Sequence, residues 1–338
     1  MTTITEVARK AGVSPTTVSH VLNDTRFVSE GVRTRVQAAM SELGYQPNAL
    51  ARSLRRGETQ TIGLVLPDSA NLFFAEIGRA IEDAAFRHGY SVVLCNTEGD
   101  SARERVYTDV LSKKQVDGMV FVATGEEDGV ANALEHSRLP LILVDRELQI
   151  QNADAVLTDN FQGGWLAAQH LLAQGHTALA CISGPSRVNP SAERVTGFCE
   201  ALRAAGLPVE PDRICRGDFH PESGYQNALE LLRAPQRPTA LFVCNDLMAI
   251  GVLRAAAELG LRVPADLSVI GFDDIELAEY TLPPLTTIAQ PKQQVGQLAI
   301  DLLLERIGEP ALPARRVVLP VELIARHSTG PAPELIHR

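Results

Sequence analysis

The chain has few cysteines and lacks the short motifs of common enzymes. Its 338 residues include five cysteines, no two of which form a CxxC pair, and three lie in the strand-like runs VVLCN, ALACIS and LFVCN. This placement predicts buried, reduced thiols rather than disulfides or metal ligands. No GxGxxG, GxxxxGKS/T, GxSxG or HExxH string occurs. We therefore expect no metal, no cofactor and no enzymatic activity.

Long apolar runs are also absent. No stretch reaches the ~18 consecutive apolar residues that a membrane-spanning helix needs. The first ten residues, MTTITEVARK, lack the apolar core of a signal peptide. With 45% hydrophobic residues, the composition is that of an ordinary globular chain, long enough for two or three folding units. We expect no membrane association and a cytoplasmic location.

Charge is unevenly distributed along the chain. The formal net charge is −10, but residues 1–60 carry eight Lys/Arg and five Asp/Glu, a net charge of +3. The rest of the chain carries −13. A basic segment on an acidic body is typical of a chain whose one end meets a polyanion such as nucleic acid. The excess is small, so charge alone is a weak indication.

The N-terminal residues are predicted to form three short helices. The first repeats apolar residues with helical spacing over 4–11, and Gly12 ends it. The second has Ser14 as its N-cap and Pro15 at its first position. The third occupies 30–43.

The second of these helices is polar on one face and apolar on the other. The polar face carries short hydrogen-bonding side chains and one imidazole: Thr16, Ser19, His20 and Asn23. The opposite face carries aliphatic side chains: Val18, Val21 and Leu22. A solvated surface helix is the plain alternative. The preceding helix, the turn and nearby Arg26 favour a helix-turn-helix that presents this face to the major groove of DNA.

A second basic element follows at 48–57, NALARSLRRG. Ten residues are too few for a stable isolated helix in water, so the segment is either a linker or a helix that forms only against a partner. In the second case Leu54 would act as an apolar wedge between base pairs in a minor groove, held there by its basic neighbours.

The rest of the chain alternates strand-like runs with amphipathic helices. The runs occupy residues 61–67, 91–96, 118–123, 140–145, 155–159, 178–184, 240–246, 268–274 and 286–291. Such alternation predicts parallel sheets covered by helices, and the number of strands suits two doubly wound lobes better than one sheet. A helix that starts after Pro291 is expected to return the chain to the first lobe.

The predicted organisation is an all-α head followed by a two-lobed α/β body. The helix-turn-helix domain spans 1–47, the hinge helix and linker 48–60, the body 61–330 and a tail 331–338. Within the body, lobe 1 takes about 61–159 and 291–318, and lobe 2 about 160–290.

Ligands of such sheets bind beyond the carboxyl ends of the strands. The residues found there are three aromatic and seven hydrogen-bonding ones: Asn71, Phe73, Phe74, Asp145, Arg146, Arg194, Phe219, Asn245, Asp273 and Gln290. Carboxylate, amide and guanidinium groups hold vicinal hydroxyls while rings pack on C–H faces, so the set predicts a cleft for a small polyol. Taken singly, each residue also has a structural explanation, such as a surface ion pair for Asp145 and Arg146.

The head resembles the DNA-binding head of the LacI/GalR repressor family in the strings ITEVARKAGVSPTTVSHVLNDTRFVS and YQPNALARSL. The resemblance implies contacts with double-stranded palindromic operator DNA. The implied contact residues are Ser14, Pro15, Thr16, Thr17, Ser19, His20, Asn23, Arg26, Ser53, Leu54 and Arg55. Thr16, Thr17 and His20 would read bases. Pro15 departs from the family pattern, because a polar side chain often stands at its position.

The body resembles the periplasmic sugar-binding-protein fold, and within it ribose repressors and ribose-binding proteins, through NLFF (71–74), VDR (144–146) and Asn245, Asp273 and Gln290. The resemblance implies that the polar residues above hold sugar hydroxyls and that Phe73, Phe74 and Phe219 sandwich the ring. Ala123–Thr124 replace an asparagine of the ribose pattern. A purine corepressor is the alternative, which Val188 and Pro190 disfavour because they replace two base-gripping residues.

Together these features predict a dimeric transcriptional repressor whose effector is ribose or a related monosaccharide that acts as an inducer. A homodimer is expected because one head makes few DNA contacts and the C-terminal HSTGPAPELIHR lacks a leucine heptad. A sugar-binding transport protein and a sugar-metabolising enzyme are remote alternatives, since the first needs export and neither needs a DNA-binding head.

Overall fold

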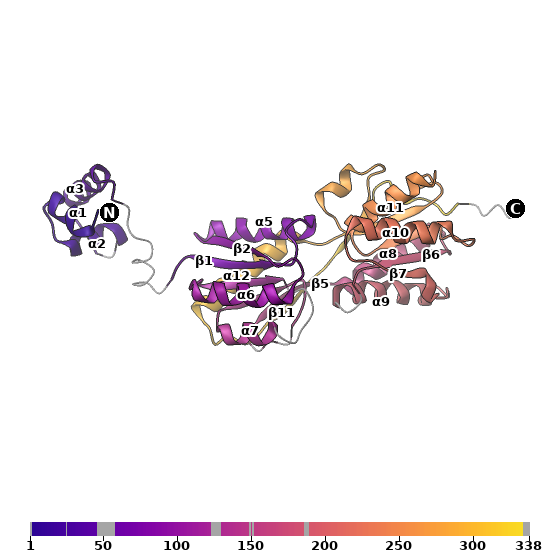
Figure 1. The fold of residues 1–338 in the computed structure, drawn as a ribbon, viewed down its shortest axis with the longest axis horizontal. Coiled ribbons are helices and arrows are strands. Elements are labelled where there is room, and N and C mark those ends of the chain that lie inside the picture. The colour runs from indigo at the N-terminus through magenta and orange to yellow at the C-terminus, as the bar shows by residue number, and fades with distance from the viewer. Residues whose placement is uncertain are drawn as a thin grey trace. The chain divides into compact units, whose positions relative to one another are not determined.

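The structure is a computed structural model that describes residues 2–24, 26–45, 58–122, 130–148, 150, 152–185 and 189–333. The chain forms two compact units, residues 1–59 and 60–338, which are described separately below and shown in Figure 1. The predicted hinge contacts Ser53, Leu54 and Arg55, together with Ala123–Thr124 and Val188, lie outside the described residues.

The first unit contains three helices: α1 (Ile4–Ala11), α2 (Pro15–Asn23) and α3 (Glu30–Glu42). Thr3 and Glu6 form a reciprocal capping box at the start of α1, and Gly12 ends that helix with φ 66°. The aliphatic faces of the helices meet in one small core: Val7, Ala8, Ala11, Val18, Val21, Val36 and Ala39. The three helices therefore lie where the apolar spacing predicted them.

Lobe 1 of the second unit is a parallel sheet in the order β11-β5-β4-β3-β1-β2. Its strands are β1 (Thr61–Leu66), β2 (Ser91–Asn96), β3 (Gly118–Val122), β4 (Leu141–Val144), β5 (Asp154–Thr158) and β11 (Arg316–Leu319). Its helices are α5 (Leu72–Arg87), α6 (Ser101–Lys113), α7 (Val130–Ser137) and α12 (Lys292–Gly308). The buried faces of α5 and α12 share one core cluster and those of α6 and α7 another, so helices cover both sides of the sheet.

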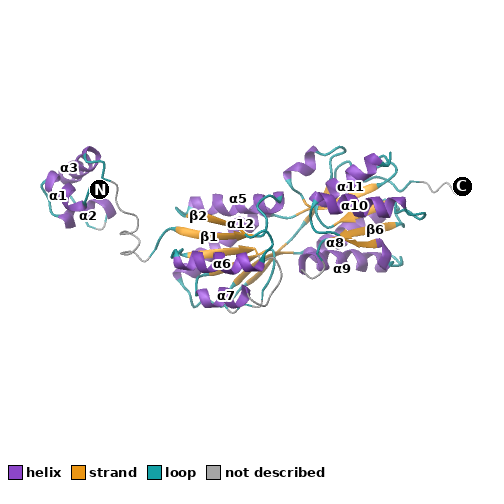
Figure 2. Cartoon of the chain, in the orientation of Figure 1, coloured by secondary structure: helices purple, strands orange, loops and turns teal. Residues whose placement is uncertain are grey.

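Lobe 2 has the order β12-β10-β9-β8-β6-β7. Its strands are β6 (Leu179–Ser183), β7 (Ile214–Arg216), β8 (Ala240–Val243), β9 (Ser268–Asp273), β10 (Thr286–Ala289) and β12 (Glu322–Ile324). Its helices are α8 (Asn160–Ala173), α9 (Asn189–Ala204), α10 (Pro221–Arg233) and α11 (Asp246–Glu258), with the 3₁₀ turns η1 (Pro211–Arg213) and η2 (Glu276–Tyr280). Figure 2 shows the strands inside each lobe and the helices outside.

The predicted fold class is confirmed, with two local differences. The nine predicted runs all form strands, but β7, β11 and β12 were not predicted because they have only three or four residues and are partly exposed. The helix after Pro291 does return to lobe 1, whereas β12 then adds an antiparallel edge to lobe 2. Among the described residues the chain therefore crosses between the lobes three times, after β5, β10 and β11.

Two further expectations concern the cysteines and the apolar helices. All five cysteines are free; Cys215 is half-buried and the other four are buried. No helix within the described ranges is long and apolar enough to cross a membrane.

His176 connects three segments at the amino edge of the lobe 2 sheet. Its Nδ1 lies 2.9 Å from Thr239 Oγ1, and its Nε2 lies 3.0 Å from Ser268 Oγ and from the carbonyl oxygen of Gly330. Burial lowers the pKa of His176 although the Gly330 carbonyl raises it. The neutral ring therefore joins the loop after α8 to two strand starts and to the C-terminal segment.

We expect the free energy of unfolding of the body to fall as the pH drops below about 6.5, the ordinary pKa of an unfolded histidine. The unfolded chain then binds a proton that folded His176 accepts only at lower pH. In His176→Gln this component is lost, so the urea midpoint should fall less between about pH 7 and about pH 5. The single tryptophan, Trp165, reports the transition by fluorescence. Equal pH slopes in the two proteins would contradict this role.

Candidate functional site

The second helix of the head is capped at its N-terminus and carries a polar face that is exposed to half-buried. Ser14 Oγ accepts a hydrogen bond from the backbone N–H of Thr17 at 3.1 Å, and Pro15 occupies the first helical turn. Val18 is fully buried. Thr16 is exposed, while Thr17 and the two other described residues of the polar face, Ser19 and His20, are half-buried. The cap thus fixes where α2 begins, and burial of Val18 and Val21 in the core turns the opposite, polar face toward the surface.

Three residues at or beyond the end of α2 bear on the predicted DNA contacts. The side chain of Asn23 lies outside the description, and its successor Asp24 adopts φ 49° at the helix end. The Asp24 carboxylate pairs with Arg33 of α3 at 2.6 Å. Arg26 is exposed. It is therefore free to approach an external partner.

In the body, the carboxyl ends of strands from both lobes converge on one cavity, here named the interlobe cavity. Its lining residues are Asn71, Phe73, Phe74, Asp145, Arg146, Pro190, Arg194, Phe219, Asn245 and Asp273. Nine of the ten residues predicted from the strand ends are therefore brought together. The tenth, Gln290, is buried beside the cavity and donates through Nε2 to Asp273 Oδ1 at 2.8 Å.

Arg194 organises the lobe 2 side of the cavity. Its Nε donates to Asn160 Oδ1 at 2.7 Å and its Nη1 donates to the Cys244 carbonyl oxygen at 2.6 Å. The same Nη1 lies 3.6 Å from Asp273 Oδ1, and the guanidinium carbon lies 3.7 Å from the centre of the Phe272 ring. With 3% of its surface exposed, this guanidinium is a fixed positive charge below the cavity.

Asp145 and Arg146 place a second pair of opposite charges on the lobe 1 side. Asp145 Oδ2 lies 3.7 Å from Arg146 Nε, and both side chains are buried. Burial raises the pKa of Asp145, although Arg146 and Arg194 lower it. Asp145 Oδ1 is buried with no hydrogen-bond partner among the described residues. A buried carboxylate oxygen of this kind is an acceptor ready for a ligand hydroxyl.

Asp273 has a strained backbone and a perturbed carboxyl group. Its φ is 114°, and φ of the next residue, Asp274, is 54°. Burial raises the pKa of Asp273 to about 7 against the lowering effects of Arg194, Gln290 and Lys292. Gln290 also accepts from the Thr158 hydroxyl at 2.7 Å, which joins the ends of β5 and β10. The hydrogen-bond chain therefore runs from lobe 1 to Asp273.

Aromatic rings close the cavity from both sides. The Phe73 and Phe74 rings of lobe 1 lie 5.2 Å apart at 60°. Phe219 of lobe 2 adopts φ 71°, and its carbonyl accepts from Asn245 Nδ2 at 3.0 Å. The Phe219 ring lies against Gly184, where an added Cβ would come within 2.1 Å of a ring carbon. Rings on two lobes give the cavity apolar walls beside its charged floor.

Two residues that support the site were missed by the sequence reasoning, and so was Pro190 as a lining residue. Asn160 is buried under Arg194, and Asp246 is fully buried and accepts from the N–H of Ile275 at 2.9 Å. Both directly follow strand-end residues in the sequence, so their position was a usable signal. Their partners come from distant segments, which strand-end spacing does not reveal. Within the described ranges, no group of three or more His, Cys, Asp or Glu is arranged to hold a metal ion.

Two family models match the chain. The model described as "Bacterial regulatory proteins, lacI family" matches residues 3–48, and "Periplasmic binding protein-like domain" matches residues 168–329. The ribose operon repressor of Escherichia coli (strain K12) is 43% identical over 329 residues, which cover 97% of this chain and 100% of that protein. The chain belongs to the lacI family. It is a DNA-binding transcriptional repressor and not an enzyme.

Other family members differ in the effector that their names imply. The HTH-type transcriptional repressor PurR of Proteus mirabilis (strain HI4320) is 40% identical over 340 residues, covering 100% of both chains. The lac repressor dimer bound to operator and the anti-inducer ONPF superimposes with a TM-score of 0.88 at 33% identity, covering 97% of this chain and 99% of that one. A LacI family regulator from Enterococcus faecium with bound ribose gives 0.73 at 36% identity, covering 80% and 99%. The family is thus established, and the effector is a separate question.

Gly184→Ala tests the packing of the Phe219 ring. The new methyl group would overlap the ring, so we expect the body to lose about 1–3 kcal/mol of stability, measured by urea unfolding. Gly308→Ala is the matched control, because a Cβ at the end of α12 meets nothing within 4 Å. Equal stability of Gly184→Ala and the native chain would show that the ring is not fixed there.

Proposed function

We propose that this repressor releases or holds palindromic operator DNA according to whether its interlobe cavity contains ribose or a related monosaccharide. The observation that carries the proposal is the convergence, in one buried cavity, of two carboxyl groups, two guanidinium groups and three aromatic rings from both lobes. Carboxylates and guanidinium groups bind vicinal hydroxyls in pairs, and rings pack on the C–H faces of a sugar. Relatives named as ribose repressors, or solved with ribose bound, support this choice.

The DNA contacts follow from the exposed face of α2. In the family pattern, Thr16, Thr17 and His20 would read base edges in the major groove. Phosphates would be contacted by Ser14, Ser19 and Asn23, and Arg26 would contact a base or phosphate. Pro15 has no donor, so any contact at that position would be apolar. Ser53, Leu54 and Arg55 would bind the minor groove, with Leu54 as the wedge.

Apolar exposed side chains favour a dimer. Leu94 of the edge strand β2 is 50% exposed, and Phe86 of α5 is 75% exposed. In lobe 2, Tyr280 is 71% exposed and Leu282 is 93% exposed. Unpaired sheet edges and large exposed apolar side chains suit a surface that another subunit covers. A dimer also gives two heads for the two half-sites of a palindrome.

In this dimer, sugar binding would close the lobes and change the separation of the two hinge segments, 48–56. Hinge helices that cannot pair would not insert Leu54, and the heads would detach. Coupling of this kind typically changes operator affinity about 5- to 150-fold.

A purine effector is the competing possibility, because PurR proteins are about as similar to this chain as ribose repressors are. Pro190 lines the cavity and has no side-chain donor or acceptor for a base edge. The deciding experiment selects palindromic duplexes from a random pool with the full chain. Fluorescence anisotropy then follows release on titration with ribose, other pentoses, hexoses and hypoxanthine. Release by ribose alone supports the proposal, and release or tightening by hypoxanthine overturns it.

Asp145→Asn should weaken ribose binding by more than about tenfold, the size of a hydrogen bond to a charged group. Asparagine tolerates the φ of 68° at this position, so the fold should persist. Calorimetry measures sugar affinity and anisotropy measures operator affinity without sugar, which should stay unchanged. Asp109→Asn, on the exposed side of α6, is the control. A ribose affinity equal to that of the native chain would remove Asp145 from the sugar site.

Ribose binding should also depend on pH through Asp273. Its pKa of about 7 means that the carboxylate is lost as the pH falls below neutrality. Because the protonated form has lost one acceptor for sugar hydroxyls, the dissociation constant should rise between about pH 8 and about pH 6. Asp273→Asn should bind weakly at every pH in that interval. A native profile that is flat there would contradict the role of this carboxylate.

A further inference from the structure

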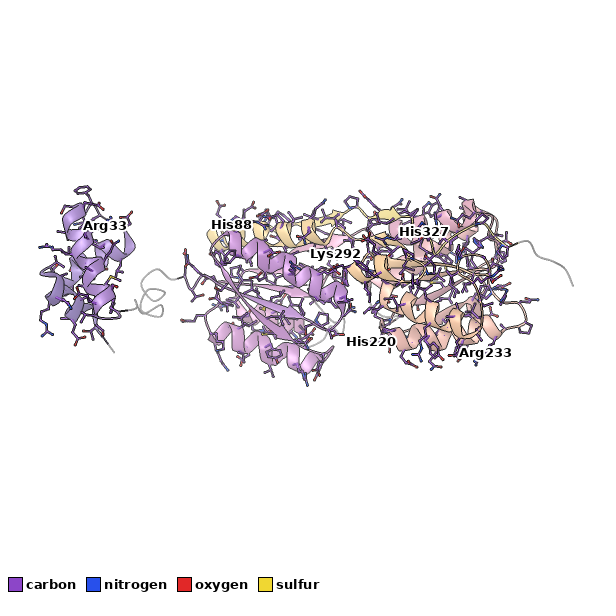
Figure 3. All side chains as sticks on the ribbon, turned by 90° about the horizontal axis from the view of Figure 1, so that it is seen from above. Arg33, His88, His220, Arg233, Lys292 and His327 are labelled. Carbon is purple, nitrogen blue, oxygen red and sulfur yellow. The ribbon has the colours of Figure 1, made fainter. Side chains whose placement is uncertain are left out.

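Lys292 and Glu76 form an ion pair that does not line the interlobe cavity but contacts the backbone next to Asp273, a residue that does. Lys292 is the first residue of α12, and Glu76 lies in the second turn of α5, so both belong to lobe 1. Lys292 Nζ lies 2.9 Å from Glu76 Oε2. The side chains are 13% and 26% exposed, so the pair is largely shielded from solvent. Figure 3 shows Lys292 where the two lobes meet.

This pair makes three hydrogen bonds to one short segment of lobe 2, residues 273–276. Lys292 Nζ donates to the carbonyl oxygen of Asp273 at 2.8 Å and to that of Asp274. Glu76 Oε1 accepts from the backbone N–H of Glu276 at 2.9 Å. One ion pair of lobe 1 therefore binds the backbone of the lobe 2 segment that carries the Asp273 carboxylate.

The backbone of the 273–276 segment is strained, and these hydrogen bonds offset part of the cost. Asp273 and Asp274 both have left-handed φ values, which cost free energy in residues other than glycine. From the lobe 2 side, Asp246 accepts from the N–H of Ile275. Also within lobe 2, Arg326 pairs with the Asp274 carboxylate at 2.7 Å and Gln290 donates to Asp273 Oδ1 at 2.8 Å. From lobe 1, Glu76 and Lys292 provide three bonds to the backbone of the segment. A separation of the lobes would break these three bonds and leave those within lobe 2.

The position of Glu76 also relates these bonds to the cavity. The same helix, α5, carries Phe73 and Phe74 in its first turn, and Asn71 caps it. The α5 start therefore approaches lobe 2 in two places at once, with its rings at the cavity and with Glu76 at the 273–276 segment. In this conformation the cavity walls and the bonds of the ion pair to lobe 2 are formed together.

We propose that Glu76 and Lys292 are positioning residues that latch lobe 1 onto the 273–276 segment and so set how readily the effector cavity closes. The inference rests on the proposed function for its ligand, but the latch itself is a property of the lobes. Lys292 also lowers the pKa of Asp273, so the sugar affinities of Lys292 variants are compared at a pH well above the native Asp273 value of about 7. At that pH, removing the latch leaves the sugar-contacting side chains in place and makes the closed state less populated. Apparent sugar affinity then falls in proportion to that population.

Four variants of the full chain test the latch. Lys292→Met removes the charge and all donors at similar length, and Lys292→Arg restores a charged donor. Glu76→Gln retains an acceptor for Glu276 but loses the charge. Lys113→Met is the control, because it breaks an exposed ion pair with Asp109 within α6 of lobe 1. Circular dichroism confirms folding of each variant before measurement.

Calorimetry with ribose and hydrogen exchange at the Ile275 and Glu276 amides are the two readouts. Lys292→Met and Glu76→Gln should each weaken ribose binding about tenfold, with rescue by Lys292→Arg and no change in Lys113→Met. They should also require about tenfold more ribose for operator release. The double variant should lose little more than either single one, because both break the same unit.

The hydrogen-exchange arm separates this inference from the proposed function. In the absence of sugar, the Glu276 amide should exchange faster in Lys292→Met than in the native chain, whatever the effector is. The Ile275 amide, which is bonded to Asp246 within lobe 2, is the internal reference and should exchange at the same rate in both. If the native chain ignores ribose but this difference appears, the latch stands and the proposed effector fails. If the native chain binds ribose and both latch variants match it in affinity and exchange, the latch is overturned. Faster exchange in Lys113→Met as well would overturn it too.

Discussion

The stability of the body and its proposed ligand binding both depend on how the charges buried in the interlobe cavity are compensated. Asp145 and Asp273 are removed from water, and burial raises the pKa of both. Transfer of a carboxylate into a protein interior costs several kcal/mol unless partners compensate it. Arg146 and Arg194 supply opposite charge, but at 3.7 Å and 3.6 Å they lie beyond ideal hydrogen-bond distance. Asp273 is also compensated by Gln290, which donates to it at 2.8 Å, but Asp145 Oδ1 has no hydrogen-bond partner among the described residues, so compensation is incomplete there.

This incomplete compensation relates stability to ligand binding. A carboxyl group whose pKa is higher in the folded state than in the unfolded one makes stability fall as the pH rises from about 4 toward 7. Asp273 contributes in this direction, whereas His176 contributes in the opposite one. A hydroxyl-rich ligand that donates to buried carboxylates stabilises the folded state by mass action. Under the proposed function, the buried carboxylates lower the stability of the body without sugar, and the bound sugar raises that stability by donating hydrogen bonds to them.

The sequence predicted the parts of this arrangement that follow local rules. Caps such as Ser14 and stops such as Gly12 located the helices, and apolar runs located nine strands. Because parallel strands end at one edge, residues that follow them had to converge, and nine of ten predicted residues line the cavity. Asn160 and Asp246 escaped prediction because their partners, Arg194 and Ile275, are distant in sequence. The strand β12 escaped because three residues carry too little pattern.

Contacts between the lobes cannot be predicted from the sequence for the same reason: their partners are distant along the chain. Residues that line a cavity can be found from strand ends, since each occupies a position defined by its own strand. Thr158 and Gln290, or Glu76 and Glu276, are matched only when the chain has crossed between lobes and returned. Their chemistry is ordinary for surface residues, so composition gives no signal. In a two-lobed protein of this kind, the residues that line the cavity can therefore be predicted from the strand ends. The contacts that hold the two lobes together cannot, because they depend on where the crossovers bring distant side chains together.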